Sequence, residues 1–292
     1  GAHRVERERE GQLIAADEIS IRVPRTNERR PDSRYTTNLI IRNSAESWYH
    51  AGQLEWESGV VGGFQGRASY TFGKAIDTGS EATFVGTGDS NILGPYDGEY
   101  NRGLSRFDTR HRFTLLGSYE IPWLRNRNDI VGSIFGGWQV STVVKLSSGT
   151  PFTIIDTGAP DFNFDGVGNA RPVCVNPDYC SGRVVGDPGN SQSQMPRDAY
   201  RRVQYGDDLS DLVGRNTMFT DSREIVDMSL QKAFAIPAFG DRFVVRLDVF
   251  NVLDEEVWGF PVNDFANANF GAINTVAAYT PRTFQLGLRY IY

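Results

Sequence analysis

The chain has 292 residues, enough for one large domain or two of ordinary size. Charged residues make up 23% of it and apolar residues 39%, and no run of eighteen apolar residues occurs, which excludes a helical membrane protein. The net charge of −6 argues against nucleic acid as a partner. A membrane β-barrel remains compatible with this composition, because residues that face a barrel lumen lower the average hydropathy.

The first 35 residues differ from the rest of the chain because charged side chains are frequent among them. Residues 12–23 are a candidate strand within this segment. The chain opens GAHRVERERE without a methionine, so we expect a fragment or a processed protein. The sequence therefore predicts a charge-rich N-terminal segment over residues 1–35 and a β-domain over residues 36–292.

From residue 36 onward, apolar and polar residues alternate in a series of short segments. In residues 111–121, for example, Phe113, Leu115 and Tyr119 alternate with polar side chains. A period of two places the apolar residues on one face of a strand and the polar residues on the other. We predict about eight or nine such strands, long enough to cross a bilayer when tilted. The segments are 36–43, 48–57, 64–75, 111–121, 138–146, 225–234, 242–252 and 283–292.

Shorter and longer connections alternate between these segments. The shorter ones are 58–63, 122–137 and 235–241, and the longer ones are 76–110, 147–223 and 253–281. Up-and-down membrane barrels have short periplasmic turns and long extracellular loops, whereas compact soluble domains rarely contain such long loops. The predicted fold is therefore all-β: an antiparallel up-and-down transmembrane β-barrel segment with long extracellular loops. The predicted helical content is at most a single turn at 198–203 or 207–213.

Charged residues on the polar sides of the strands are the predicted lining of a wet lumen. Both signs occur, so these side chains could pair with one another, hold a plug or line a solute path. In a soluble β-sandwich the same residues would form the solvated face instead. The predicted lumen-facing residues are Arg67, Arg112, Glu120, Lys145, Asp227, Arg246, Asp248 and Arg289.

The two cysteines, Cys174 and Cys180, lie in a stretch rich in Pro, Gly and Asp. Five intervening residues can close a disulfide loop, which requires an oxidising compartment. Two free thiols are the alternative. We predict the disulfide.

A second motif in the same long loop resembles the start of a calcium-binding loop. Asp161, Asn163 and Asp165 offer oxygen ligands at alternate positions, and Gly166 follows. Pro172 occupies the twelfth position, so the bidentate glutamate of such loops is missing. Asp and Asn clusters also form ordinary turns, which is the alternative to bound Ca²⁺.

Signatures of common enzyme classes do not occur: the chain has no G-x-S-x-G, H-E-x-x-H, G-x-x-x-x-G-K-[ST] or G-x-G-x-x-G motif. We therefore expect no enzymatic activity and no organic cofactor.

Six motifs in order resemble a known family. They are SYTFGKAID (69–77), RFDTRHRF (106–113), GGWQ (136–139) leading to LSSGTPF (146–152), DFNFDG (161–166) with Arg171 and Pro172, RLDVFN (246–251), and PRTFQLGLR (281–289). Together they resemble the C-terminal barrel portion of TonB-dependent outer-membrane receptors, in particular the Oar-like group with a carboxypeptidase-regulatory-like domain. The resemblance covers residues 35–292.

The resemblance implies a place in the outer membrane of a Gram-negative bacterium, within a 22-stranded barrel that imports a scarce or large solute. The implied partners are outer-membrane lipid, the barrel assembly machinery, an extracellular ligand and the TonB complex, which acts through a plug. No plug or TonB-contacting box is recognisable, so the chain resembles the last third of such a receptor. The final strand ends on Tyr290 and Tyr292, and in outer-membrane barrels the last aromatic residue helps to recruit the assembly machinery.

Two alternatives to uptake remain open at this point. One is a structural or adhesive outer-membrane protein that transports nothing. The other is a soluble secreted β-sandwich that acts as a binding module.

Overall fold

The structure is a computed structural model that describes residues 7–9, 12–14, 45–80, 99–124, 127, 129–160, 162, 170–184, 189, 191–236, 241–273 and 281–292. The predicted strand 36–43 and most of the candidate strand 12–23 lie outside these ranges. Within the charge-rich N-terminal segment, β1 (Arg7–Arg9) and β2 (Gln12–Ile14) form a small antiparallel hairpin.

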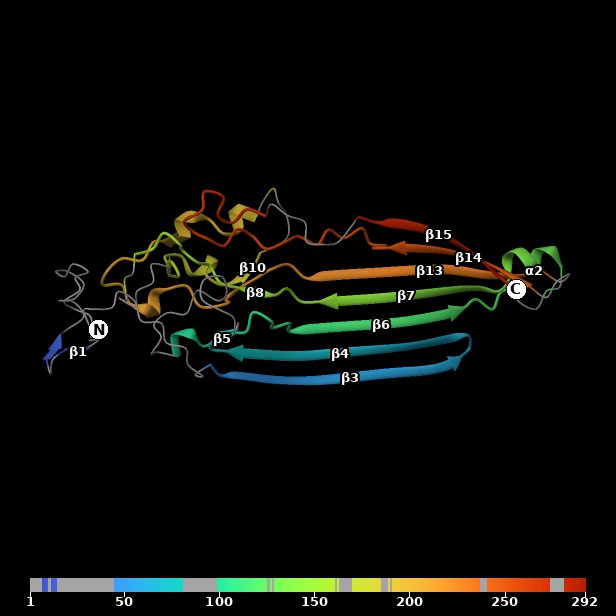
Figure 1. Cartoon of the computed structure of the whole chain (residues 1–292), viewed down its shortest axis with the longest axis horizontal. Helices are drawn as coiled ribbons and strands as arrows, with labels where there is room; N and C mark the ends of the chain where they lie inside the picture. Colours follow the sequence, from blue (N-terminus) through green and yellow to red (C-terminus); the bar gives the residue numbers. More distant parts are fainter. Residues whose placement is uncertain are drawn as a thin grey trace.

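One antiparallel sheet dominates the structure (Figure 1). Each long strand pairs with the next long strand along the chain, and the two-residue strand β5 (Gly103–Leu104) pairs with β4. This order confirms the predicted up-and-down topology, and the sheet has eight strands in all. The seven long strands are β3 (Ser47–Val61), β4 (Phe64–Asp77), β6 (His111–Glu120), β7 (Trp138–Ser147), β13 (Arg223–Ile236), β14 (Asp241–Phe250) and β15 (Thr283–Ile291).

The first turn is shorter than the sequence predicts. β3 continues to Val61, so the predicted turn at 58–63 shrinks to Gly62 and Gly63. Both glycines have positive φ, 60° and 85°, the conformation that a tight two-residue hairpin requires. A Cβ at Gly63 would also lie 2.7 Å from the carbonyl oxygen of Glu120, so the neighbouring strand leaves no room for a side chain.

A short helix, α2 (Ile130–Phe135), occupies the connection between β6 and β7. The carboxylate of Asp129 caps it by accepting a hydrogen bond from the backbone N–H of Gly132 at 2.9 Å. The sequence prediction missed this helix, because six residues are too few for a helical periodicity to stand out. The single turns expected at 198–203 and 207–213 are the 3₁₀ helices η5 (Arg197–Ala199) and η6 (Leu209–Asp211).

The long loops fold together at one end of the sheet (Figure 1). We call the described residues of 148–222 and 251–273 the loop cap. Its elements are β8 (Pro151–Phe152), β9 (Val173–Cys174), η3 (Pro177–Tyr179), β10 (Gly182–Arg183), η4 (Ser191–Gln194), η5, β11 (Tyr200–Arg201), η6 and β12 (Met218–Phe219). The helix η2 (Glu99–Asn101) lies in the connection from β4 to β6.

The hydrophobic core of the described residues lies in this cap and not in the sheet. One cluster joins the two long loops, since Ile154, Met195 and Val213 of the first pack with Phe270 and Ile273 of the second. A smaller cluster includes Val203 and Leu212. Among the long-strand residues whose burial the structure describes, only Ile225 is a buried hydrophobic residue. The cap is therefore a folded unit that stands on the strand ends.

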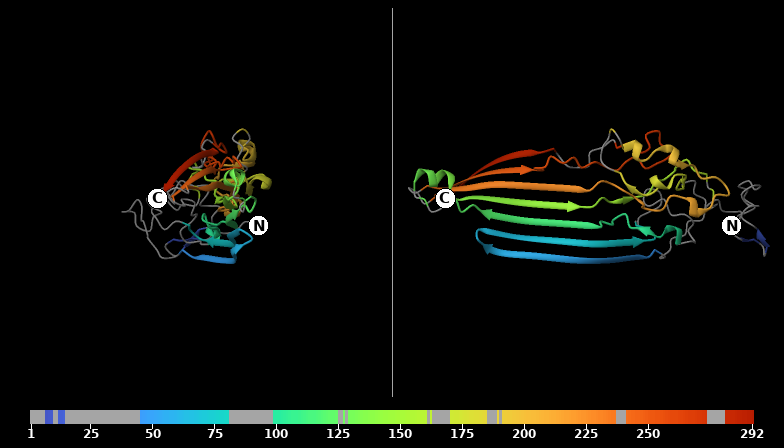
Figure 2. Two further views of the ribbon diagram at one scale, coloured as in Figure 1. Left: turned by 90° about the vertical axis from the view of Figure 1, so that its right-hand side faces the viewer. Right: turned by 180° about the vertical axis from the view of Figure 1, so that it is seen from behind.

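Seen along the strands, the sheet follows an open arc (Figure 2, left). Within the described residues, β3 and β15 each have one long partner strand, so they are the two edges of the arc. The turn between β3 and β4, the helix α2 and the C-terminus lie at the end of the sheet away from the cap (Figure 1). No helix among the described residues is long and apolar enough to span a membrane.

Candidate functional site

All eight residues predicted to face a lumen lie on one face of the sheet. Strand pairing aligns one residue from each of four neighbouring strands. These residues are Arg67 of β4, Leu116 of β6, Val143 of β7 and Asp227 of β13. Residues opposite one another in an antiparallel pair point to the same face. The same register brings in Arg112 opposite Ser147, Glu120 opposite Gln139, Lys145 opposite Thr114, Arg246 opposite Gln231, Asp248 opposite Ser229, and Arg289 opposite Val244. We call this surface the polar face.

Hydrogen bonds join neighbouring strands across the polar face. The amide of Gln139 donates to the hydroxyl of Ser118 at 2.6 Å, and the amide of Gln231 donates to Gln139 at 2.5 Å. Two ion pairs lie on the same surface: Arg67 with Glu55 at 3.4 Å, and Arg246 with Asp248 at 2.8 Å. A hydrated wall of mixed charge of this kind suits a polar solute or another hydrophilic segment.

The opposite face of the sheet is apolar, and no described residue covers it. Leu54, Phe72, Leu247, Leu286 and Leu288 all remain exposed, with Leu286 at 67%. A soluble sandwich would bury this face against a second sheet, and soluble monomers rarely expose so large an apolar surface. The β-sandwich alternative is therefore wrong. We call this surface the apolar face.

The loop cap is attached to the sheet by buried polar contacts. Arg215 of the cap pairs with Asp77, the last residue of β4, at 2.7 Å. Next to it, the side-chain amide of Asn216 donates to the carbonyl oxygen of Leu104 at 2.7 Å. The backbone N–H of Asn216 donates to Thr153 at 2.9 Å, and the hydroxyl of Thr153 donates to the Asn216 side chain at 2.8 Å. The sequence prediction missed these residues, because no local pattern distinguishes a buried Arg from the others.

Ion pairs within the cap shift the pKa values of their members. Asp156, fully buried, accepts two hydrogen bonds from Arg202 at 2.8 and 3.0 Å, and this contact raises the pKa of Arg202. The hydrogen bonds from Arg201 lower the pKa of Asp207. Burial disfavours the charged form of Asp264, but hydrogen bonds from Thr157 and Ala266 and the charge of Arg202 outweigh it, so the pKa of Asp264 is lowered.

The predicted disulfide between Cys174 and Cys180 is present and lies in the cap. It closes a loop around η3, and Cys180 belongs to the main cap core. The predicted calcium ligands Asp161, Asn163 and Asp165 lie outside the described residues. In the part of the chain that the structure describes, no three His, Cys, Asp or Glu side chains cluster as metal ligands would.

The two terminal tyrosines lie at the end of the sheet away from the cap. Tyr290 is opposite Phe243 of β14 and belongs to the apolar face. Tyr292 follows the last residue of β15, and its ring centroid is 6.4 Å from that of Tyr290. An exposed aromatic pair therefore ends the chain at this rim. Recognition of these two residues by the assembly machinery stays a prediction.

Residues 3–285 match the family described as outer membrane beta barrel domain. Searches of curated proteins and of solved structures found no match.

Proposed function

The chain belongs to the outer membrane β-barrel domain family and is located in the outer membrane of a Gram-negative bacterium, and on that premise we propose that it forms part of a TonB-dependent receptor. In this role the sheet is part of the barrel wall, and the loop cap captures a solute for uptake. The proposal assigns the chain no catalysis. Its partners would be the lipid bilayer, the barrel assembly machinery, the extracellular solute and, through a plug, the TonB complex.

The location of the cap is the observation that supports this proposal best. The cap stands over the end of the sheet with the long loops, which is the extracellular end of an up-and-down barrel. Its own core, disulfide and buried ion pairs make it a preformed surface rather than a set of loose loops. A solute released from the cap would next meet the polar face of the wall.

The arc must be completed by further strands in this role. Unpaired backbone groups in lipid cost several kcal/mol each, so the edges β3 and β15 need partners in the membrane. Three of the receptor-like motifs lie at the ends of strands: RFDTRHRF and LSSGTPF lie where β6 and β7 meet the cap. GGWQ lies at the opposite rim, where α2 leads into β7.

Uptake by whole cells tests the proposal. Cells that express the entire reading frame, and cells that lack it, would be supplied with radiolabelled iron–siderophore, cobalamin and oligosaccharide probes. We expect the uptake of one probe to require the protein and to stop when a protonophore removes the energy source. Uptake that persists with the protonophore would argue for a passive channel instead.

A structural or adhesive role without transport is the second candidate, and the rigid, disulfide-closed cap favours it. In that case none of the probes would depend on the protein, whereas cell attachment to surfaces would.

A further inference from the structure

Three cationic side chains lie together on the polar face, where the strands meet the loop cap. Arg112 is the second residue of β6 and Arg223 is the first residue of β13, and both are opposite Ser147, the last residue of β7. Lys145 precedes Ser147 by two residues, so it lies on the same face. Neighbouring strands are about 5 Å apart, which places the backbones at Arg112 and Arg223 about 10 Å apart. We call Arg112, Lys145 and Arg223 the basic cluster.

The charge of the basic cluster is not cancelled by its neighbours in the sheet. All three side chains are exposed. Among the residues that the structure describes, none of the three has an ion-pair partner. The residues opposite them on the adjoining strands are all neutral: Thr71, Thr114, Ser147 and Ile225.

One carboxylate lies close to the basic cluster on the polar face. Asp227 of β13 is opposite Val143, which is two residues from Lys145 in β7. The carboxylate of Asp227 accepts a hydrogen bond from the backbone N–H of Asn251 at 2.9 Å. This contact joins Asp227 to the loop cap, so three cations face a single carboxylate that already has a partner.

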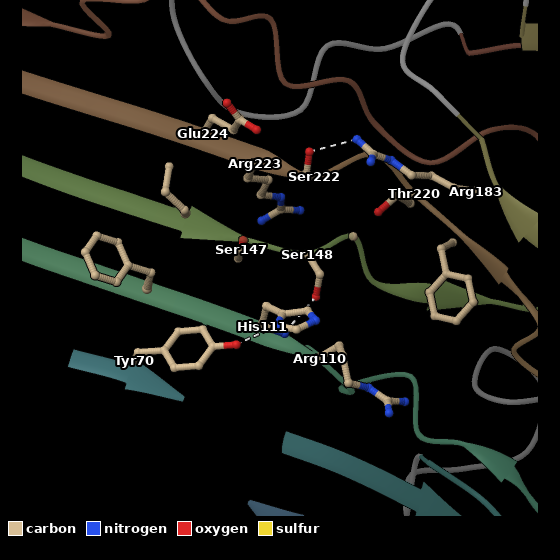
Figure 3. A pocket seen from close by; sticks show the side chains of 14 residues that line it. Tyr70, Arg110, His111, Ser147, Ser148, Arg183, Thr220, Ser222, Arg223 and Glu224 are labelled. Carbon is tan, nitrogen blue, oxygen red and sulfur yellow. Dashed lines mark hydrogen bonds between the residues drawn. The ribbon is translucent and has the colours of Figure 1, made fainter. Parts of the chain in front are cut away.

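Glu224 does not add to the negative charge of the polar face, although it follows Arg223 in the chain. It is opposite Leu146 and therefore lies on the apolar face. Figure 3 shows Arg223 beside Ser147 at the end of the strands, and the side chain of Glu224 points away from Arg223.

Other charges on the polar face are arranged differently. Arg67 pairs with Glu55, and Arg246 pairs with Asp248. These pairs need no further ligand. The three members of the basic cluster instead repel one another, and an anion held between them would replace repulsion with attraction. The basic cluster is therefore a binding surface for negative charge just below the cap.

We propose that the basic cluster binds a solute that carries two or more anionic groups, phosphate or carboxylate, as it passes from the cap into the lumen. Guanidinium groups bind both kinds of group through paired, charge-assisted hydrogen bonds. Arg112 and Arg223 contact the solute from two sides, and Lys145 contacts it between them. The inference rests on the proposed function and names the class of solute.

Equilibrium dialysis of the full protein in phosphatidylcholine nanodiscs tests the proposal. The radiolabelled probes are fructose 1,6-bisphosphate, the dicarboxylate glucarate and uncharged fructose. We expect binding of the bisphosphate, the dicarboxylate or both, and none of fructose, and the two anionic probes show which group the surface prefers. The double variant Arg112→Gln/Arg223→Gln should bind the anionic probe at least about tenfold more weakly, because two charge-assisted contacts are lost.

Matched variants separate a local site from a general effect of charge. Arg289→Gln removes a positive charge from the polar face at the end of the sheet away from the cap, and it should leave binding unchanged. Asp227→Asn keeps an oxygen for the N–H of Asn251 but removes the nearby negative charge, so it should tighten binding.

Three results would overturn the proposal: fructose binding as tightly as the anions, binding of neither anion, or equal affinities in the double variant and the unmodified protein. Equal weakening by Arg289→Gln would also overturn it. Uptake by cells gives a separate answer about transport. Binding of an anion that cells never take up would leave the basic cluster in place and count against transport. Energy-dependent uptake of an uncharged probe, without binding of either anion, would do the reverse.

Discussion

Arg215 and Asp77 form a buried ion pair between two segments that are 138 residues apart in the chain. Their side chains are 0% and 6% exposed, and the guanidinium also donates to the carbonyl oxygens of Asp77 and Asn101 at 2.9 and 3.0 Å. A buried charge is tolerated only when its hydrogen-bonding groups are satisfied. This pair therefore fixes the loop cap in one position over the end of β4.

Replacing Arg215 with Met should release the cap from the sheet. The substitution leaves Asp77 buried without its partner, and breaking a buried ion pair costs about 3–5 kcal/mol. We expect faster hydrogen exchange and easier proteolysis in residues 148–222, whereas the strands stay protected. Arg201→Met is the control, because Arg201 pairs with Asp207 at a more exposed position, 43% for Arg201. Equal protease sensitivity of the two variants would contradict the anchoring role.

The two faces of the sheet could be predicted from the sequence, because a strand alternates its side chains without reference to any distant residue. When neighbouring strands pair, their polar sides align, so Arg67, Asp227 and Asp248 come to lie on one surface of the sheet. The cap could not be predicted in this way. Its core joins residues such as Met195 and Phe270, and Arg215 reaches Asp77 from another loop, so only the folded chain brings these groups together.

An arginine on the apolar face should disturb assembly, and one on the polar face should not. Leu286 lies opposite Leu247 on the apolar face, and the adjacent Gln285 lies opposite Asp248 on the polar face. Leu286→Arg should cost roughly 2–4 kcal/mol near the membrane midplane. Gln285→Arg should assemble normally, because its charge meets water and a carboxylate. The fraction of folded protein in outer-membrane preparations measures both, and normal assembly of Leu286→Arg would refute the lipid-facing assignment.

Removal of residues 290–292 should reduce insertion into the outer membrane. Tyr290 and Tyr292 form the aromatic end of the last strand, and we expect the assembly machinery to recognise it. The ratio of surface-exposed to total protein gives the effect. The variant Tyr292→Phe keeps the aromatic ring and should insert normally, and unchanged insertion of the truncated chain would contradict a terminal signal.

Loss of the disulfide should loosen the cap locally. Alkylation of the denatured protein should add two labels after reduction and none before it, since both cysteines are paired. The double variant Cys174→Ser/Cys180→Ser should lose about 2 kcal/mol of cap stability, because the bond closes only a short loop. Cap proteolysis at rising urea concentration measures this loss. Labelling without reduction would show that the thiols are free.

The connection before β7 presents an apolar surface at the rim opposite the cap. Trp123 is 76% exposed, and Ile130 and Phe135 of α2 are also exposed. The indole of Trp138 donates to the carbonyl oxygen of Ile134 at 3.1 Å, which attaches α2 to the wall. Aromatic residues are enriched where the membrane meets water, so we expect this surface to lie in the periplasmic headgroup region.

A fluorophore attached at position 123 tests this location. The native cysteines are paired, so Trp123→Cys offers one reactive thiol for an environment-sensitive dye. In liposomes with brominated lipid we expect strong quenching of this dye, because bromine in the bilayer quenches only nearby fluorophores. A dye on Glu57→Cys, whose side chain belongs to the polar face, should be quenched weakly. Equal weak quenching at both positions would place the turn in water and leave the apolar surface of α2 without a membrane role.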